Sequence, residues 1–144
     1  MDSAKETPPR ITLEQFNRLC AEELPFLRVF GAEVMAIGHG WARARLPASG
    51  DMLRPGGTIA GPAQMALADF VMYAAVLGAV GEVPLAVTTQ LSINFLHRPK
   101  GALVAACRLI KLGKRLAVGE VRLEDETGTL VSHVTATYSI PPER

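Results

Sequence analysis

The stretch that decides the fold is PGGTIAGPAQMALADFVMYAAVLGAVG, residues 55–81 of the 144-residue chain. Pro62 suits the first position of a helix, where its missing N–H is no loss, and this makes Gly61 the expected cap. The run predicts a long helix from Pro62 to about Leu77, closed by Gly78 and Gly81. Because this helix is apolar nearly all round, we expect other structure to enclose it.

Asp69 is the only charged residue between Arg54 and Glu82. A carboxylate among apolar side chains is expensive to desolvate unless something pairs with it, and burial sharpens it as a base. Such a residue is a candidate for a functional site. The alternative interpretation is that Asp69 faces out from a partly wet side of the helix, and the run alone does not favour one over the other.

Outward from this helix, the patterns predict a short helix and six strands. Thr12, followed by Gln15 three residues later, is typical of a capping box and begins a helix over residues 13–23. Strands are expected over residues 32–37, 41–46, 85–96, 103–112, 116–123 and 130–140. Short links between successive strands indicate antiparallel hairpins. The sequence therefore predicts an α+β fold in which an antiparallel β-sheet wraps around one long central α-helix.

Length and composition fit a single domain over residues 1–144, with residues 1–11 as a loose N-terminal arm. The chain is 49% apolar, enough for a real core, and its net charge of +1 argues against a nucleic-acid partner. The apolar stretch 59–80 raises the membrane question, but its Gly, Pro, Gln and Asp content favours a buried helix and no membrane partner. The N-terminus is polar and shows no secretory signal, so we expect a cytoplasmic protein.

Cysteine and histidine positions indicate no metal centre. Cys20 and Cys107 form no CxxC pattern, and we interpret them as small core residues in a reducing compartment. The three histidines show no ligand spacing with another His, Cys or acid, so no metal site is expected. The glycines before the long helix lack the lysine of a P-loop and the spacing of a dinucleotide-binding loop.

Three segments, in this order and at this spacing, are more specific together than any one of them. They are LRPGGTIAGP (53–62) leading into MALAD (65–69), VTTQLSINFL (87–96) followed by Arg-Pro (98–99), and the turn GKR (113–115). Together they resemble the hot-dog fold, and specifically the PaaI-type acyl-CoA thioesterases. The resemblance covers roughly residues 30–141. It implies a hot-dog fold and hydrolysis of an acyl-CoA, with CoA as part of the substrate and no separate cofactor.

The resemblance also implies catalytic roles. In that family a Gly at the start of the central helix offers its backbone N–H to the thioester oxygen, and the matching residue is Gly61. An Asp or Glu about two turns later activates water as a general base or attacks the carbonyl as a nucleophile, and the matching residue is Asp69. A Ser or Thr on the next strand holds the water, which points to Thr88 or Thr89, with Thr88 favoured. Adjacent strand residues face opposite sides, so only one of the two reaches the site.

The chain departs from the family pattern near the helix start. Ala60-Gly61-Pro62 stands where many relatives have His-Gly-Gly, and Arg54 stands where many have Asn. Arg54 is a candidate for binding a carboxylate or phosphate of the substrate or for polarising its carbonyl. A surface ion pair is the commoner fate of a loop arginine.

The spacing of Gly61 and Asp69 predicts a site shared between two copies of the chain. Eight helical residues rise roughly 12 Å, whereas an oxyanion donor and a catalytic carboxylate must both come within about 3–4 Å of one carbonyl. Two antiparallel helices would bring Gly61 of one copy to Asp69 of the other. We expect a two-fold homodimer, or a dimer of dimers, with active sites at the interface.

Other residues are candidates for substrate binding. Gln90 and Asn94 are expected on the same strand face as Thr88. Tyr73 follows the catalytic acid by one helical turn, and with Met65 it hints at a pocket for a medium acyl or aryl group.

A basic stretch without acidic residues runs from Val83 to Gly119. Such a bias suits the phosphates of coenzyme A. The candidate phosphate-binding residues are Arg98, Lys100, Lys114 and Arg115. For any one of them, a role in blocking edge-to-edge aggregation is the commoner explanation.

The leading hypothesis is therefore an acyl-CoA thioesterase. The competing hypothesis is a non-catalytic hot-dog module that binds acyl-CoA or lipid, in which the altered helix start has lost the chemistry. A purely structural role in a larger complex is the third.

Overall fold

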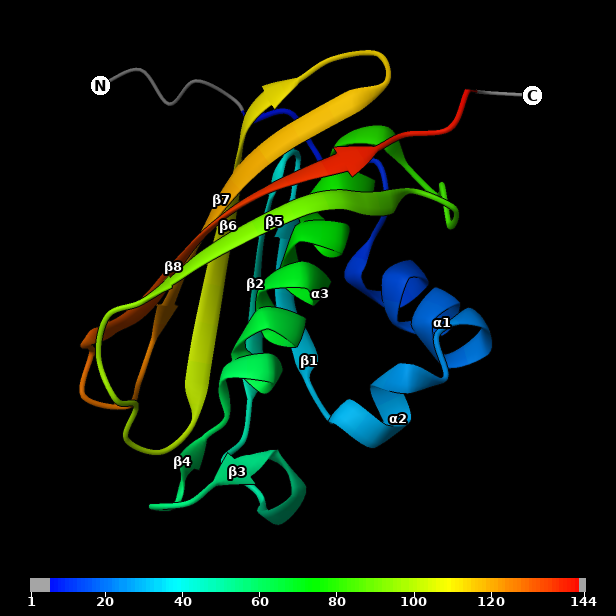
Figure 1. Cartoon of the computed structure of the whole chain (residues 1–144). Coiled ribbons are helices and arrows are strands. Elements are labelled where there is room, and N and C mark those ends of the chain that lie inside the picture. The colour runs from blue at the N-terminus through cyan, green and yellow to red at the C-terminus, as the bar shows by residue number, and fades with distance from the viewer. Residues whose placement is uncertain (1–5, 143–144) are drawn as a thin grey trace.

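The computed structural model describes residues 6–142 and shows one long helix held by a curved sheet (Figure 1). The helix, α3, spans Gly61–Val80. The six-stranded sheet contains β1 (Glu33–Gly38), β2 (Trp41–Leu46), β5 (Val87–Phe95), β6 (Leu103–Leu112), β7 (Leu116–Glu124) and β8 (Leu130–Ser139). Its order is β1-β2-β6-β7-β8-β5, and every ladder is antiparallel. The expected α+β arrangement, a sheet around a central helix, is confirmed.

Two short helices, α1 (Leu13–Glu23) and α2 (Phe26–Phe30), lie beside α3 on the side away from the sheet (Figure 1). The bounds of α1 and its capping box are as predicted, because Gln15 N donates to Thr12 Oγ1 at 3.1 Å and Thr12 N to Gln15 Oε1 at 2.9 Å. Helix α2 was not predicted. Pro25 ends the first helix as expected, but its fixed φ, here −61°, also starts a new turn.

The loop before α3 has more structure than expected. It holds a 3₁₀ turn, η1 (Gly50–Met52), and a two-stranded hairpin of β3 (Leu53–Arg54) and β4 (Thr58–Ile59). This hairpin lies at the N-terminal end of α3 (Figure 1). Ala60 N donates to Met52 O at 2.8 Å, which ties the turn to the start of the helix.

Both ends of α3 differ from the prediction. Gly61 is the first helical residue and Ala60 is the cap, since Ala60 O accepts the first helical bond from Gln64 N at 3.1 Å. Gly78 lies inside the helix, which continues to Val80, whereas Gly81 follows the last helical residue and caps it as predicted. A Cβ at Gly78 would collide with the carbonyl oxygen of Gly38 in β1, so this glycine allows close packing and does not end the helix.

The predicted hairpin between β5 and β6 is wrong. β5 forms the edge of the sheet beside β8, and β6 lies between β2 and β7. The hairpins β1–β2, β6–β7 and β7–β8 are as predicted. The short link after β5 therefore crosses from one edge of the sheet to its interior. The number of residues between two strands does not show whether they pair or are separated by other strands.

A β-bulge at Thr89 changes which residues of β5 face the helix. In the ladder with β8, Thr88 pairs with Tyr138 and Gln90 pairs with Thr137. Thr89 therefore has no partner and is an extra residue. Paired residues share a face of the sheet, which places Thr88 toward α3 and Gln90 on the outer face. The expectation that Gln90 and Asn94 share the face of Thr88 is therefore wrong, because strict alternation fails across a bulge.

The N-terminal arm is shorter than predicted. Ile11 is 2% exposed and belongs to the core, and Arg10 N donates to Gly78 O at 2.7 Å. Residues 6–9 form neither helix nor strand, and residues 1–5 of the predicted arm lie outside the described residues. By length and composition α3 could cross a membrane, but 72% of its apolar window is buried inside the fold, as in the core helix of a globular domain.

Candidate active site

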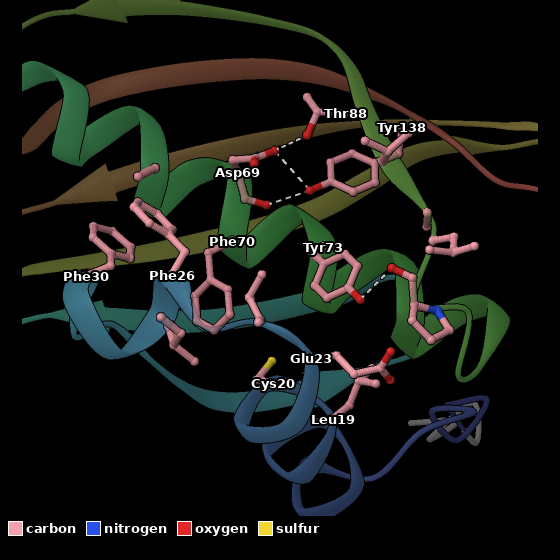
Figure 2. Close-up of a pocket in the computed structure, with 17 residues that line it drawn as sticks. Leu19, Cys20, Glu23, Phe26, Phe30, Asp69, Phe70, Tyr73, Thr88 and Tyr138 are labelled. Carbon is pink, nitrogen blue, oxygen red and sulfur yellow. Dashed lines mark hydrogen bonds between the residues drawn. The ribbon is translucent and has the colours of Figure 1, made fainter.

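An apolar cavity of about 320 Å³ lies between α3, the two short helices and the start of β5 (Figure 2). Hydrophobic side chains from α1 and α2 form one wall, including Leu19, Leu27 and Phe30. The opposite wall carries three polar groups, from Asp69, Thr88 and Tyr138. Such a lining, mostly apolar with a few convergent polar groups, is typical of a small-molecule site.

Asp69 is half-buried in this wall, and two hydroxyl groups hold its carboxylate (Figure 2). Thr88 Oγ1 and Tyr138 Oη both donate to Asp69 Oδ1, the tyrosine at 2.9 Å. Tyr138 Oη also lies 3.0 Å from Asp69 O. Among residues 6–142 none donates a hydrogen bond to Oδ2, so one carboxylate oxygen is fixed and the other is left for a reacting group.

Tyr138 is the member of this group that sequence reasoning missed. Its ring is buried, and burial together with the nearby negative charge of Asp69 raises the pKa of Tyr138 above its usual value. The phenol therefore stays protonated and serves as a donor. The only sequence signal was a tyrosine in an alternating strand, and its pairing with Thr88 depends on the register of β5 against β8.

Tyr73 lines the same cavity, as predicted from its position one turn beyond Asp69. Its hydroxyl donates to Pro84 O at 3.0 Å, and burial, with smaller contributions from nearby acidic groups, raises the pKa of Tyr73 to about 12. Cys20 also lines the cavity, and burial raises the pKa of its thiol to about 11. A protonated thiol is a poor nucleophile, which leaves the carboxylates of Asp69 and Glu23, and the two hydroxyls bind that of Asp69.

A second, more open groove surrounds the N-terminus of α3. Gly61, Arg54 and Arg98 all line it, so the structure brings these three predicted site residues together. Pro62 has no N–H, and the N–H of Gly61 has no acceptor among residues 6–142. Gly61 and Asp69 thus line different hollows of one chain, as their spacing on the helix predicted.

Met65 lies between the two hollows and lines neither of them. It belongs to an open stripe along α3, whose residues are not buried. These are Gly61, Pro62, Met65, Ala66, Asp69 and Tyr73. Their spacing of three and four residues places them on one face of the helix. The other faces of α3 are buried, so the expectation that other structure encloses the helix holds in a single chain everywhere except along this stripe.

Several predicted residues are not brought to either hollow. Gln90 and Asn94 are exposed on the outer face of β5. Lys114 and Arg115 lie in the β6–β7 turn, at the opposite end of β6 from Lys100 (Figure 1). β6 has ten residues and is roughly 30 Å long, so one chain does not gather the four candidate phosphate-binding cations into one cluster.

Among residues 6–142 no three His, Cys, Asp or Glu side chains gather as a metal ion would require. The polar side chains along the two linings are Asp69, Thr88, Tyr138, Tyr73 and Glu23 in the cavity, and Arg54, Arg98, Thr58, His97 and Gln64 in the groove.

Comparisons with known proteins agree with this architecture. A family model described as the thioesterase superfamily matches residues 56–132. The crystal structure of a candidate thioesterase from Silicibacter sp. TM1040 is similar at 37% sequence identity and a TM-score of 0.84, over 96% of this chain and 97% of that one. A curated candidate esterase of Haemophilus influenzae is 28% identical over 130 residues, which are 90% of this chain and 93% of the relative. The phenylacetic acid degradation protein PaaI of Thermus thermophilus is similar at 25% identity and a TM-score of 0.72, over 81% of this chain and 99% of that one.

Proposed function

The chain belongs to the thioesterase superfamily, and on this premise we propose that it hydrolyses acyl-CoA thioesters to the free acid and CoA. The membership confirms the hot-dog fold and the resemblance to PaaI-type thioesterases, and it supports thioester hydrolysis in general. The observation that carries the finer proposal is the position of Asp69. Its half-buried carboxylate lies in the wall of a cavity that suits an acyl or aryl group.

In the proposed reaction Asp69 acts on the thioester carbonyl in one of two ways. As a general base it takes a proton from water, and the hydroxide adds to the carbonyl carbon. As a nucleophile it adds to that carbon itself, and water then cleaves the resulting anhydride. In both routes the C–S bond breaks, the acid is released, and the thiolate takes up a proton. Thr88 keeps lone pairs free to hold the attacking water beside the carboxylate.

The developing oxyanion needs a donor, and the unpaired N–H of Gly61 supports that role. It lies at the N-terminus of a 20-residue helix, whose dipole favours negative charge. Gly61 has no side chain, and a Cβ there would lie 3.2 Å from the ring of Phe95, which lines the same groove. Because Gly61 and Asp69 of one chain line different hollows, the proposed site pairs Gly61 of one copy with Asp69 of another.

The open stripe of α3 supports this pairing. Met65 is 39% exposed and lies four residues from Gly61 and four from Asp69. If a two-fold axis passes beside Met65 and the two helices are antiparallel, Gly61 of each copy lies opposite Asp69 of the other. The dimer then has two equivalent sites. β5 is also an edge strand with exposed apolar residues, Val87 and Phe95, which a second copy would cover.

The groove at the helix N-terminus would take the CoA end of the substrate. Arg54 and Arg98 both line it, and guanidinium groups bind phosphate in a bidentate manner. Both side chains are exposed and therefore free to reach a flexible nucleotide. Arg54 is therefore proposed to bind a phosphate of CoA.

An acyl-CoA panel tests the proposal, with release of the free thiol as the readout. We expect hydrolysis of medium-chain or aryl esters, and a loss of at least about a hundredfold in kcat for Asp69→Asn. Unchanged turnover in that variant would remove Asp69 from the mechanism. Saturable binding of acyl-CoA without turnover of any ester would favour the non-catalytic module. A single turnover in ¹⁸O-labelled water detects the nucleophilic route if water attacks the Asp69 carbonyl of the anhydride, since only that pathway places label in Asp69.

A further inference from the structure

Gln64 is a buried polar side chain whose amide is only half satisfied. It is 4% exposed, and its Nε2 donates to Ile59 O at 3.2 Å. Its Oε1 is buried and has no hydrogen-bond partner among residues 6–142. The other such atom, Ser132 Oγ, lines neither hollow. A buried carbonyl oxygen without a hydrogen-bond donor destabilises the fold by about 1–3 kcal/mol. A ligand that donates a hydrogen bond to Gln64 would remove this cost.

The position of Gln64 connects it to the oxyanion donor. It follows Gly61 by three residues, so both lie on one face of α3, and both line the groove with the two arginines. The bond to Ile59 O requires an N–H, which fixes the amide so that Oε1 is the free end. The lining of the groove therefore contains a free backbone donor at Gly61 and the unsatisfied amide oxygen of Gln64, from residues whose backbones are about 4.5 Å apart along the helix axis.

A pantetheine thioester is long enough to reach both groups. From the carbonyl oxygen the chain runs through carbon, sulfur and two methylenes to an amide N–H, a span of roughly 5–6 Å. We propose that Gln64 Oε1 accepts a hydrogen bond from this amide while Gly61 N–H binds the carbonyl, so that Gln64 selects thioesters that carry an amide N–H two methylenes from the sulfur. This inference rests on the proposed thioesterase function and adds to it a determinant for the thiol half of the substrate.

Two small thioesters test the inference without any change to the protein. Octanoyl-N-acetylcysteamine and the octanoyl thioester of 2-mercaptoethyl acetate differ only by an amide N–H in place of an ester oxygen. The wild-type protein should show a kcat/KM at least about tenfold higher for the amide, after correction for the rates without enzyme. Equal kcat/KM values for the pair would overturn the inference. Hydrolysis of neither these nor any acyl-CoA would instead count against the proposed function.

Gln64→Met, which keeps the volume and removes the amide, completes the test. The variant should lose about tenfold on the amide substrate and little on the ester, so that the ratio falls toward one. Equal losses on both substrates would indicate a packing role and overturn the inference. Octanoyl-CoA and an octanoyl carrier protein, which both carry pantetheine, are then compared as substrates. The variant should lose activity on whichever source the wild type uses, and an unchanged rate there would also contradict the proposal.

Discussion

At the scale of single residues, the chemistry depends on how Asp69 is held. Two hydroxyl donors converge on Oδ1, from Thr88 on β5 and from Tyr138 on β8. Neighbouring strands therefore fix the carboxylate of a helix, which is the kind of preorganisation that a base or nucleophile needs. Hydrogen bonds to a charged group are worth about 1.5–3 kcal/mol each.

Thr88→Val should therefore lower kcat/KM for the best acyl-CoA ester by about 10–100-fold, because it removes one donor and keeps the shape. Thr88→Ser keeps the hydroxyl and is the matched control, which should stay within a few-fold of wild type. The measurement is steady-state thiol release by both variants. Equal activities for the valine and serine variants would show that the hydroxyl has no role.

Sequence reasoning reached part of this residue-scale picture. Asp69 stood out because it is the one charge in an apolar run. Tyr138 and Gln64 were not singled out, since a tyrosine in a strand and a neutral amide in a helix are both common. Their importance comes from contacts with Asp69 and Ile59 that only the folded chain creates.

At the scale of elements, the position of α3 depends on a close approach to β1. Gly78 lies against the carbonyl of Gly38, where a side chain has no room. β1 also packs against α1, which forms part of the wall of the acyl cavity, so a shift of β1 would disturb that wall.

Gly78→Ala should lower the free energy of unfolding by about 1–3 kcal/mol or more, because the new Cβ meets a backbone atom that cannot turn away. Gly50→Ala is the control, since a Cβ at Gly50 has no atom within 4 Å. Chemical denaturation of the two variants checks the prediction. A Gly78→Ala variant as stable as Gly50→Ala would mean that the helix and strand are not packed as described.

A second element, the β7–β8 turn, anchors the segment that carries Arg98. Asp125 accepts from Lys100 N at 3.0 Å and from Thr127 Oγ1 at 2.6 Å. The Thr127 hydroxyl, with backbone N–H groups, lowers the pKa of Asp125 to about 2. A carboxyl group whose pKa is lowered by folding stabilises the fold fully when the pH is above the pKa that the group has in the unfolded chain, which is about 4. That contribution is lost as the pH falls toward 2.

Thr127→Ala should therefore lower the stability at pH 7 by about 1 kcal/mol and reduce the further loss between pH 4 and pH 2. Thr127→Ser keeps the hydroxyl and should follow the wild type. Thermal unfolding of the three proteins at about pH 7, 4 and 2.5 is the measurement. Parallel curves for the alanine variant and the wild type across this range would contradict the linkage.

The helices and strands themselves were largely predictable, because hydrophobic periodicity and helix caps depend on residues that are close together in the sequence. The capping box at Thr12 and Gln15 indicated the bounds of α1, and alternation indicated the strands to within a few residues. Errors arose where tertiary packing overrides a local rule. Gly78 serves packing where a helix end was expected, and the bulge at Thr89 reverses the faces of β5.

At the scale of the whole molecule, the pairing of β5 with β8 could not be read from the sequence, because two other strands lie between them along the chain. The single chain leaves an edge strand and an open stripe on α3 next to its two hollows. Gly61 and Asp69 lie at equal spacing on either side of Met65. A second copy related by two-fold symmetry would complete both sites at once.

A cysteine at position 65 tests that geometry. In Met65→Cys the two new thiols should face each other across the axis and form a disulfide between copies under mild oxidation, since close-packed helices lie about 8–10 Å apart. The native Cys20 and Cys107 are buried and should not interfere. Asn17→Cys, exposed on α1, is the control and should remain uncrosslinked on a non-reducing gel. Similar crosslinking of both variants, or of neither, would speak against an axis beside Met65.

Complementation between two inactive variants tests the shared site most directly. Gly61→Val blocks the oxyanion donor and Asp69→Asn removes the base, so each homodimer should be inactive. A heterodimer of the two retains one site with both native residues, and an equal mixture should recover about a quarter of the wild-type activity. Co-expression with two different affinity tags isolates the heterodimer for assay. Activity in the heterodimer is the predicted result, and a purified heterodimer as inactive as its parents would contradict a site built from two chains.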